Sequence, residues 1–328
     1  MGKKKVLVSI INWNGSKKTR KCIESLYTSD YTNYDVLVID NASTDNSLQE
    51  LKNLYPNLIF IESKTNTGFA GGQNKGINFA IDNSYDYIWI LNNDTVMNEN
   101  TLSILVDHLS NTSLCASVSP ILINQTDNTI QFCGCAIDQD NFYFEKFKTI
   151  DSMDFYQKNK ADKVCLWGTA ILVKVSILKE IGGFSENYFA YFEDMEFSMK
   201  IIKFGMKNMI SPNALIYHEG ENNPEIRPSY YVYYNTRNKY IFWINHVNNG
   251  DKFRFIKSYL AGALLLAADW YRKKNTLLET ATLMAIFDAI TGKSGAFPGD
   301  RKKPYFFRHI LLSRPYFFVN ILRGISPF

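Results

Sequence analysis

The chain has 328 residues, 46% of them hydrophobic, and a formal net charge of +4 at pH 7. This length and composition allow a large buried core and exclude an intrinsically disordered protein. No apolar run approaches the roughly 18 residues that cross a bilayer, and residues 1–5 lead into a strand pattern without a signal peptide, so we expect a cytoplasmic protein. The five cysteines are odd in number and scattered, which is typical of reduced thiols.

The positive charge is concentrated near the C-terminus. Residues 251–328 contain 13 Lys and Arg but only 5 Asp and Glu, a net charge of +8, so the rest of the chain carries −4. Cations interleaved with aromatic residues suit an anionic membrane surface or a phosphate-bearing partner. A solvated basic face is the alternative interpretation.

The N-terminal part of the chain alternates short apolar runs with helical stretches. Strands are expected at residues 6–11, 36–39, 58–61 and 87–91, and helices at residues 17–27, 46–55 and 73–81. This spacing is typical of βαβ units, which predict a parallel, doubly wound sheet with right-handed crossovers.

Polar side chains follow three of these strands. The first strand runs into Asn12, the second ends at Asp40, and the fourth ends in Asn92-Asn93-Asp94. In open α/β sheets, ligands bind beyond the carboxyl ends of the strands, so a carboxylate at this position is well placed for chemistry. Turns and helix caps favour the same residue types, and this alternative stays open for each strand taken alone.

A glycine-bearing loop, residues 66–72, precedes the third helix. It lacks the Gly-x-Gly-x-x-Gly spacing of dinucleotide-binding folds, because Ala70 and Gln73 occupy the required places counted from Gly68. The sequence also contains neither a complete P-loop nor a Gly-x-Ser-x-Gly elbow. These absences disfavour hydride transfer with a dinucleotide, P-loop phosphate chemistry and serine hydrolysis.

The second half of the chain begins as a mixed region and then becomes helical. We expect a helix at 98–110, strands within 114–147, an irregular polar region to about 162, an apolar run at 164–173, a helix at 194–204, a strand at 214–217 and helices at 229–246, 252–271 and 276–290. Glu193 and Asp194 lie at the positive end of the 194–204 helix, which helps a carboxylate to stay ionised. His218 closes the 214–217 strand. Ordinary helix capping and a structural histidine are the alternatives.

An 11-residue repeat lies near the C-terminus. The segments 303–311 and 314–322 both place paired Phe residues beside cations. Such segments suit an interfacial membrane contact, with the aromatic side chains partly inserted and the cations at the headgroups. Packing against the main domain is an equal alternative.

Five motifs in fixed order carry a resemblance to a known family. They are Val8–Asn14, Val38–Asp45, Asn66–Gly72, Leu91–Asp94, and Gly182-Gly183-Phe184 with Tyr191–Asp194. Together they span about residues 5–220. On these motifs the chain resembles inverting family 2 glycosyltransferases of the GT-A fold, close to their rhamnosyltransferase-like branch.

The resemblance implies an architecture and a set of site residues. Residues 1–225 would form a Rossmann-like, mostly parallel α/β sheet flanked by helices, and residues 226–328 a helical, basic-aromatic region for the acceptor or a membrane surface. The residues implied to contact the nucleotide-sugar donor are Asn12, Asp40, Asn66, Gly71, Gly72 and Asn93. Asp94 and His218 would hold Mg²⁺ or Mn²⁺, and Asp194 would be the general base. The residues implied to meet the acceptor are Trp167, Glu193 and Arg237.

The sequence departs from the family pattern at three places. The metal motif keeps one carboxylate, Asp94, Ser185 replaces the commoner Asp of the Gly-Phe-Asp-Glu motif, and the Gly-x-Ser usual after His218 is missing. We therefore expect weak metal affinity without the donor phosphates. The resemblance defines the acceptor-binding residues less well than the donor-binding residues.

The leading hypothesis is transfer of rhamnose from dTDP-rhamnose to a cell-surface polysaccharide or a polyprenyl-diphosphate-linked glycan. The enzyme would lie peripherally on the inner face of the cell membrane and would not bind nucleic acid. A UDP-hexose donor is the first alternative. A sugar nucleotidyltransferase is disfavoured because residues 12–16 lack the basic, glycine-rich character that binds a triphosphate, and a non-catalytic glycan- or membrane-binding module is the third class.

Overall fold

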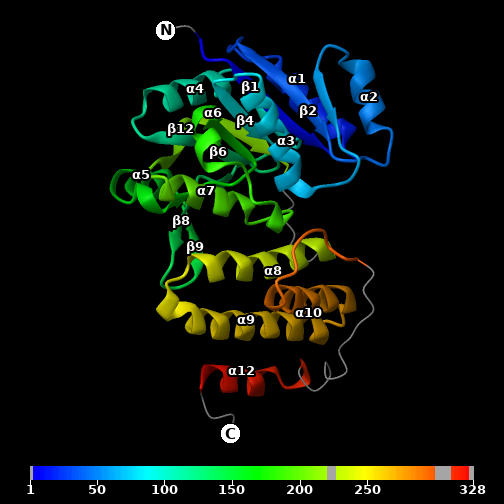
Figure 1. Ribbon diagram of the computed structural model, residues 1–328, viewed down its shortest axis with the longest axis vertical. Coiled ribbons are helices and arrows are strands. Elements are labelled where there is room, and N and C mark those ends of the chain that lie inside the picture. The colour runs from blue at the N-terminus through cyan, green and yellow to red at the C-terminus, as the bar shows by residue number, and fades with distance from the viewer. Residues whose placement is uncertain (1–2, 220–226, 300–311, 325–328) are drawn as a thin grey trace. The chain divides into compact units, whose positions relative to one another are not determined.

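The computed structural model (Figure 1) describes residues 3–219, 227–299 and 312–324. The chain divides into two compact units. The described residues of unit 1 are 3–138, 143–189 and 193–219. Those of unit 2 are 139–142, 190–192, 227–299 and 312–324.

Four parallel strands form the first half of the large sheet in unit 1. They are β1 (Val6–Asn12), β2 (Tyr34–Asp40), β3 (Ile59–Glu62) and β4 (Tyr87–Leu91), in the order β3-β2-β1-β4. The helices between them are α1 (Ser16–Leu26), α2 (Ser47–Leu54) and α3 (Gly68–Asp82). The strands read as continuous apolar runs because parallel sheets are covered on both faces. The predicted parallel arrangement is confirmed for this half.

The second half of the sheet is mixed, which corrects the expectation of a doubly wound parallel sheet. Its strands are β5 (Thr95–Met97), β6 (Cys115–Asn124), β11 (Ala170–Lys174) and β12 (Lys207–His218). β11 runs antiparallel to both β4 and β6, and β12 is parallel to β6 but antiparallel to β5. An apolar run carries no information about strand direction, so the sequence pattern could not reveal the reversal at β11.

Smaller elements complete unit 1. A three-stranded sheet contains β8 (Cys135–Asp138), β9 (Tyr143–Lys146) and β10 (Val164–Cys165), and β7 (Ile130–Phe132) pairs with β6. The remaining α-helices are α4 (Thr101–Asn111), α5 (Ile150–Asn159), α6 (Val175–Ile181) and α7 (Glu193–Lys203). The sequence predicted an irregular region where α5 lies. Only Met153 of α5 is buried, so the helix shows little hydrophobic period, and it is held instead by a capping box between Thr149 and Ser152.

Helix α3 begins at Gly68, so the expected glycine loop is largely its first turn. Two of its glycines face β1. A Cβ at Gly72 would lie 2.6 Å from Ile11 Cδ1, and a Cβ at Gly76 would lie 2.2 Å from Ser9 Oγ and 3.2 Å from Ile39 Cδ1. The glycines therefore allow α3 to approach the strands that carry the polar ends.

We expect Gly76→Ala to destabilise the protein by about 1–3 kcal/mol, because the new methyl group overpacks this contact. Ser9 Oγ cannot move without losing its 2.8 Å hydrogen bond to Gln73 Oε1. Gly262→Ala is the matched control, since Gly262 lies in a helix and a Cβ there would meet nothing within 4 Å. Thermal unfolding should show a lower midpoint for the first variant only. Equal midpoints for Gly76→Ala and the unmodified protein would contradict the close packing.

Unit 2 is mainly helical. Its long helices are α8 (Ser229–His246), α9 (Lys252–Arg272) and α10 (Thr276–Ile290), and the short helix α12 (Pro315–Arg323) follows. Helix α12 contains most of the second copy of the 11-residue repeat, and the first copy, 303–311, lies outside the described residues. Val319 is buried, whereas Tyr316 and Ile321 are 61% and 52% exposed. Within the described parts of the chain, no helix is long and apolar enough to cross a membrane.

Candidate functional site

The carboxyl ends of β1, β2 and β4 meet at one edge of the sheet. Asn12 is the register partner of Asp40, and Ile10 pairs with Leu91, which directly precedes Asn92-Asn93-Asp94. The structure therefore brings together the polar strand ends that the sequence singled out. This edge is the natural ligand-binding edge of an open α/β sheet.

Asp40 is held in place by donors from its own turn and from β1. Asn12 Nδ2 and Ser43 Oγ donate to Asp40 Oδ1 at 3.0 and 2.6 Å, and the Ser43 amide donates to Oδ2 at 3.0 Å. Asn12 is fully buried and Asp40 is 3% exposed. Asn12 thus orients the Asp40 carboxylate and is not itself at the surface.

Asn66 fixes the beginning of α3. Its Oδ1 accepts hydrogen bonds from the Gly68 amide at 2.8 Å and from Asn41 Nδ2 at 3.1 Å. Asn41 Nδ2 also donates to the Gly68 carbonyl at 2.9 Å. Gly71 and Gly72 lie in the same turn, and a Cβ at Gly71 would lie 2.7 Å from Thr67 Cβ.

A short chain of hydrogen bonds connects Asn93 to Asn12 through α1. Asn93 Nδ2 donates to Thr19 Oγ1 at 2.9 Å, and Thr19 Oγ1 donates to Asn12 Oδ1 at 2.8 Å. Because Asn12 also contacts Asp40, one network orients the ends of three neighbouring strands. Neither Thr19 nor Ser43 was expected from the sequence, although a Ser three residues after an Asp is a turn signal.

Asp94 and His218 face each other across the ends of two further strands. Thr95 of β5 is the register partner of His218 in β12, and His218 Nε2 lies 3.2 Å from Asp94 Oδ1. This oxygen is buried and has no hydrogen-bond partner. Burial opposes ionisation of Asp94, but the contact with His218 and the charge of the nearby Lys18 outweigh it, so the pKa of the carboxyl is lowered. Asp94 is thus ionised at neutral pH.

The opposing atoms of Asp94 and His218 fit a divalent cation. Mn²⁺ binds both carboxylate oxygen and imidazole nitrogen, whereas Mg²⁺ prefers the oxygen ligand. Among the described residues, no three His, Cys, Asp or Glu side chains form a group that could hold a metal ion. Two protein ligands leave most coordination positions for donor phosphates and water. Lys18 and Lys21 line a small cavity beside Asp94, where Lys18 forms an ion pair with Glu219 at 3.0 Å.

Asp194 lies at the start of α7, close to the end of β4. Its Oδ2 accepts the Gly168 amide at 3.0 Å, and its Oδ1 accepts the Met195 amide at 2.8 Å. Gly168 precedes Thr169, whose carbonyl accepts the Asn92 amide at 2.8 Å. Burial raises the pKa of the Asp194 carboxyl although the two backbone donors oppose the shift. A carboxylate with a raised pKa is a stronger base.

Glu193 is a buried carboxyl beside the half-buried Asp194. It is 5% exposed, and its Oε2 has no hydrogen-bond partner. Burial, and then the charge of Asp194, raise the pKa of Glu193 well above its usual value. The ionised form of Glu193 is therefore unfavourable in the folded protein.

We expect Glu193→Gln to raise the melting temperature by at least about 2 °C at about pH 7.5. A carboxyl whose pKa is higher in the folded than in the unfolded protein contributes its full stabilisation of the fold at pH values below the unfolded pKa. As the pH rises from the unfolded pKa toward the folded pKa, this stabilisation is lost by about 1.4 kcal/mol per pH unit. The gain should therefore shrink as pH falls toward 4.5, the ordinary value for Glu. Glu180→Gln, at an exposed site in α6, is the control. A gain independent of pH would contradict this explanation.

Trp167, which the resemblance implies to meet the acceptor, is half-buried and packs against side chains of unit 1. Its ring stacks on Phe132 with centroids 4.1 Å apart and an interplanar angle of 8°. Lys146 Nζ lies 4.3 Å from the Trp167 ring centroid. Since Phe132 covers one face, the ammonium group covers the other. Trp167 therefore supports the neighbouring Gly168, whose amide holds Asp194.

Arg237 is fully buried in unit 2, which corrects its expected position facing an acceptor diphosphate. Its Nη1 donates to the Gly295 carbonyl at 2.8 Å, and its Nε donates to Asn238 Oδ1 at 2.9 Å. Asn238 Nδ2 in turn donates to the carbonyls of Ala190 and Tyr191 at 2.8 and 2.7 Å. Arg237 thus orients the amide that holds this short segment.

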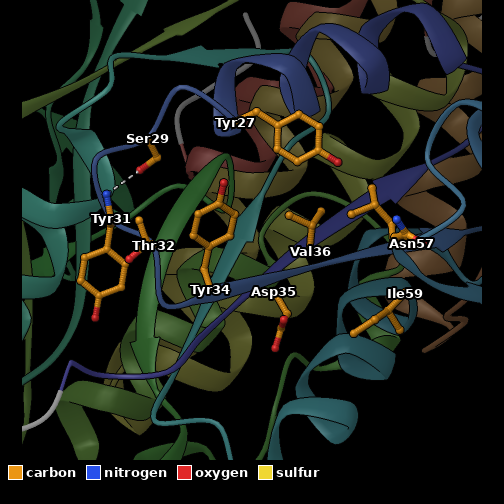
Figure 2. Close-up of a pocket in the computed structure, with 10 residues that line it drawn as sticks. Tyr27, Ser29, Tyr31, Thr32, Tyr34, Asp35, Val36, Asn57 and Ile59 are labelled. Atoms are coloured by element: carbon orange, nitrogen blue, oxygen red, sulfur yellow. Dashed lines mark hydrogen bonds between the residues drawn. The ribbon is translucent and has the colours of Figure 1, made fainter.

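A cavity lies at the opposite edge of the sheet (Figure 2). It has a volume of about 360 Å³, and its lining includes Tyr34 and Asp35 at the beginning of β2 and Ile59 at the beginning of β3. Tyr27 lies beside Tyr34 at this cavity. None of the polar strand ends lines it. Residue chemistry and geometry, rather than this cavity, therefore locate the candidate site at the carboxyl edge.

Comparison with known proteins gives a consistent picture. The family model described as glycosyl transferase family 2 matches residues 7–182. The chain is 21% identical over 243 residues to the low-salt glycan biosynthesis hexosyltransferase Agl10 of Haloferax volcanii, covering 71% of this chain and 74% of that protein. It is 23% identical over 225 residues to N-acetylglucosaminyl-diphospho-decaprenol L-rhamnosyltransferase of Mycobacterium tuberculosis, covering 63% and 73%.

A solved structure shows the same fold. The mannosyltransferase PcManGT from Pyrobaculum calidifontis, in complex with GDP-Man and Mn²⁺, superimposes with a TM-score of 0.55 at 16% identity. The similarity covers 91% of this chain and 78% of the mannosyltransferase. At this level of identity the likeness concerns the fold, which is GT-A.

Proposed function

The chain belongs to glycosyltransferase family 2, and from this we propose that it is an inverting, metal-dependent enzyme that uses a nucleotide-sugar donor. The observation that carries the proposal is the pairing of a two-ligand cation site, Asp94 with His218, with a half-buried base, Asp194, at one edge of the sheet. Donor and acceptor would meet between them. The family membership disfavours a sugar nucleotidyltransferase and a non-catalytic binding module.

We propose rhamnose from dTDP-rhamnose as the donated sugar and a polyprenyl-diphosphate-linked glycan or a cell-surface polysaccharide as the acceptor. The relative from Mycobacterium tuberculosis, an N-acetylglucosaminyl-diphospho-decaprenol L-rhamnosyltransferase, supports this choice. A UDP-hexose donor is the alternative, supported by the hexosyltransferase relative from Haloferax volcanii.

The proposed reaction is a single in-line displacement at the anomeric carbon. Asp194 takes the proton of the acceptor hydroxyl as its oxygen bonds to the anomeric carbon and the bond from that carbon to the diphosphate oxygen breaks. Asp94 and His218 would hold Mn²⁺ or Mg²⁺, which supplies positive charge for the leaving diphosphate. Asp40, oriented by Asn12, would accept a hydrogen bond from the nucleoside. Asn66, Gly71, Gly72 and Asn93 would shape the donor side.

Thermal unfolding with a panel of ligands tests this proposal. The protein is unfolded with dTDP-rhamnose, UDP-glucose, GDP-mannose or buffer, each with and without Mn²⁺. A ligand at a hundred times its dissociation constant stabilises the folded state by about 2.7 kcal/mol. A Mn²⁺-dependent shift with dTDP-rhamnose alone supports the rhamnose donor, and a shift with UDP-glucose alone supports the alternative. No shift with any nucleotide sugar would overturn the proposed donor site.

We also propose that the enzyme binds peripherally to the inner face of the cell membrane. The +8 charge of residues 251–328 and the exposed apolar side chains of Tyr316 and Ile321 on α12 support this proposal. Replacing both residues with Ser should reduce flotation with anionic vesicles. Tyr143→Ser is the control, because Tyr143 is 44% exposed in unit 1. Unchanged flotation of the double variant would contradict this contact.

A further inference from the structure

Gln131 lies at an irregular position of the sheet. Phe132 pairs with Leu122 of β6 and Ile130 pairs with Ile123, so two steps along β7 oppose a single step along β6. Gln131 is therefore the extra residue of a β-bulge. Bulges re-aim a side chain relative to a regular strand, and they occur frequently next to active sites.

The re-aimed side chain contacts the histidine of the cation site. Gln131 Oε1 lies 2.7 Å from His218 Nδ1. An amide oxygen can only accept a hydrogen bond, so His218 Nδ1 carries the proton. In a neutral imidazole the other nitrogen, Nε2, then has a free lone pair. That lone pair points to Asp94 Oδ1, which has no hydrogen-bond partner.

The opposite tautomer of His218 would block the cation site. With the proton on Nε2, His218 would donate to Asp94 Oδ1 across the 3.2 Å gap and close the space between the two ligand atoms. The energy of that hydrogen bond would then oppose entry of a cation. The hydrogen bond that His218 Nδ1 donates to Gln131 therefore favours the tautomer in which the pair can act as a binding site.

We propose that Gln131 is a positioning residue that fixes the Nδ1–H tautomer of His218 and so presents Nε2 to a divalent cation. The inference rests on the proposed metal site and extends it to a residue that does not touch the ion. Partners of this kind orient metal-binding histidines, and their loss typically weakens metal affinity by about 10- to 100-fold. Sequence reasoning could not find Gln131, because it lies in no motif and 87 residues before His218.

Titration with Mn²⁺ alone, followed by the electron paramagnetic resonance signal of free Mn²⁺, tests the proposal without knowledge of the donor. Gln131→Met removes the acceptor at similar size and should weaken Mn²⁺ binding by about 10-fold or more. Gln131→Glu keeps an acceptor and should restore the affinity. Gln49→Met, at an exposed site of α2 where the side chain donates a hydrogen bond to Asn53, is the control. Equal affinity of Gln131→Met and the unmodified protein would overturn the inference.

The tautomer is measured separately, so that this inference can fail without the proposed function. Long-range ¹H–¹⁵N correlation spectra at about pH 8.5, where imidazole is neutral, report which ring nitrogen carries the proton. The signals of His218 are identified by their loss in His218→Ala. We expect Nδ1–H in the unmodified protein and in Gln131→Glu, and Nε2–H in Gln131→Met. Nε2–H in the unmodified protein would overturn the role of Gln131 even if Mn²⁺ binds. Failure of the unmodified protein to bind Mn²⁺, with Nδ1–H present, would instead overturn the proposed metal site.

Discussion

Replacing Asp194 with Asn should lower the rate of sugar transfer by about 100- to 10,000-fold, while the donor still binds. The amide keeps the size of the carboxylate and can accept one of the two amide donors, from Gly168 or Met195, that hold the side chain. It cannot take a proton from the acceptor hydroxyl. Single-turnover rates and donor affinity, measured on the same preparation, separate the two effects.

The pH dependence of the rate gives an independent check on Asp194. A base works only when it is ionised, so the rate should rise with pH through the pKa of Asp194 and level off above it. Burial raises this pKa above the ordinary value of 3.8, and the rise should therefore occur at a higher pH than that. If Asp194→Asn keeps the full rate, or if the rate is constant down to pH 3.8, another group is the base.

The parallel half of the fold was predictable because its signals are local. Buried strands that end in Asn12, Asp40 and Asp94 combine an apolar run with a polar tip, and both features are visible in a single sequence. Parallel pairing then places all three ends at one edge. The confirmed family and fold follow from the order of these local motifs.

The remaining features depend on contacts between distant segments. The reversed direction of β11, which carries Gly168 toward Asp194, leaves no trace in an apolar run. Trp167 and Arg237 have the chemistry of sugar and phosphate binding, but residue type does not reveal burial. Trp167 is half-buried and packs against Phe132 and Lys146, and Arg237 lies inside unit 2. A prediction from residue type alone therefore assigns too many residues to the acceptor site.

Replacing Asp94 with Asn should weaken Mn²⁺ binding and lower the transfer rate by at least about 100-fold. The amide carries no charge, and the leaving diphosphate would lose the positive charge that stabilises it. His218→Ala should give a comparable loss, because it removes the second ligand. Rates measured at saturating donor, with increasing Mn²⁺, show whether a high metal concentration restores either variant.

The double variant Asp94→Asn with His218→Ala decides whether the two side chains hold one ion. If they share it, removing the second ligand after the first costs little, so the double variant should be about as slow as the slower single variant. If each side chain acts independently, the two losses in rate should multiply. The 3.2 Å separation of Asp94 Oδ1 and His218 Nε2 predicts the shared case. Multiplied losses, in variants that unfold at the same temperature as the unmodified protein, would contradict a common metal site.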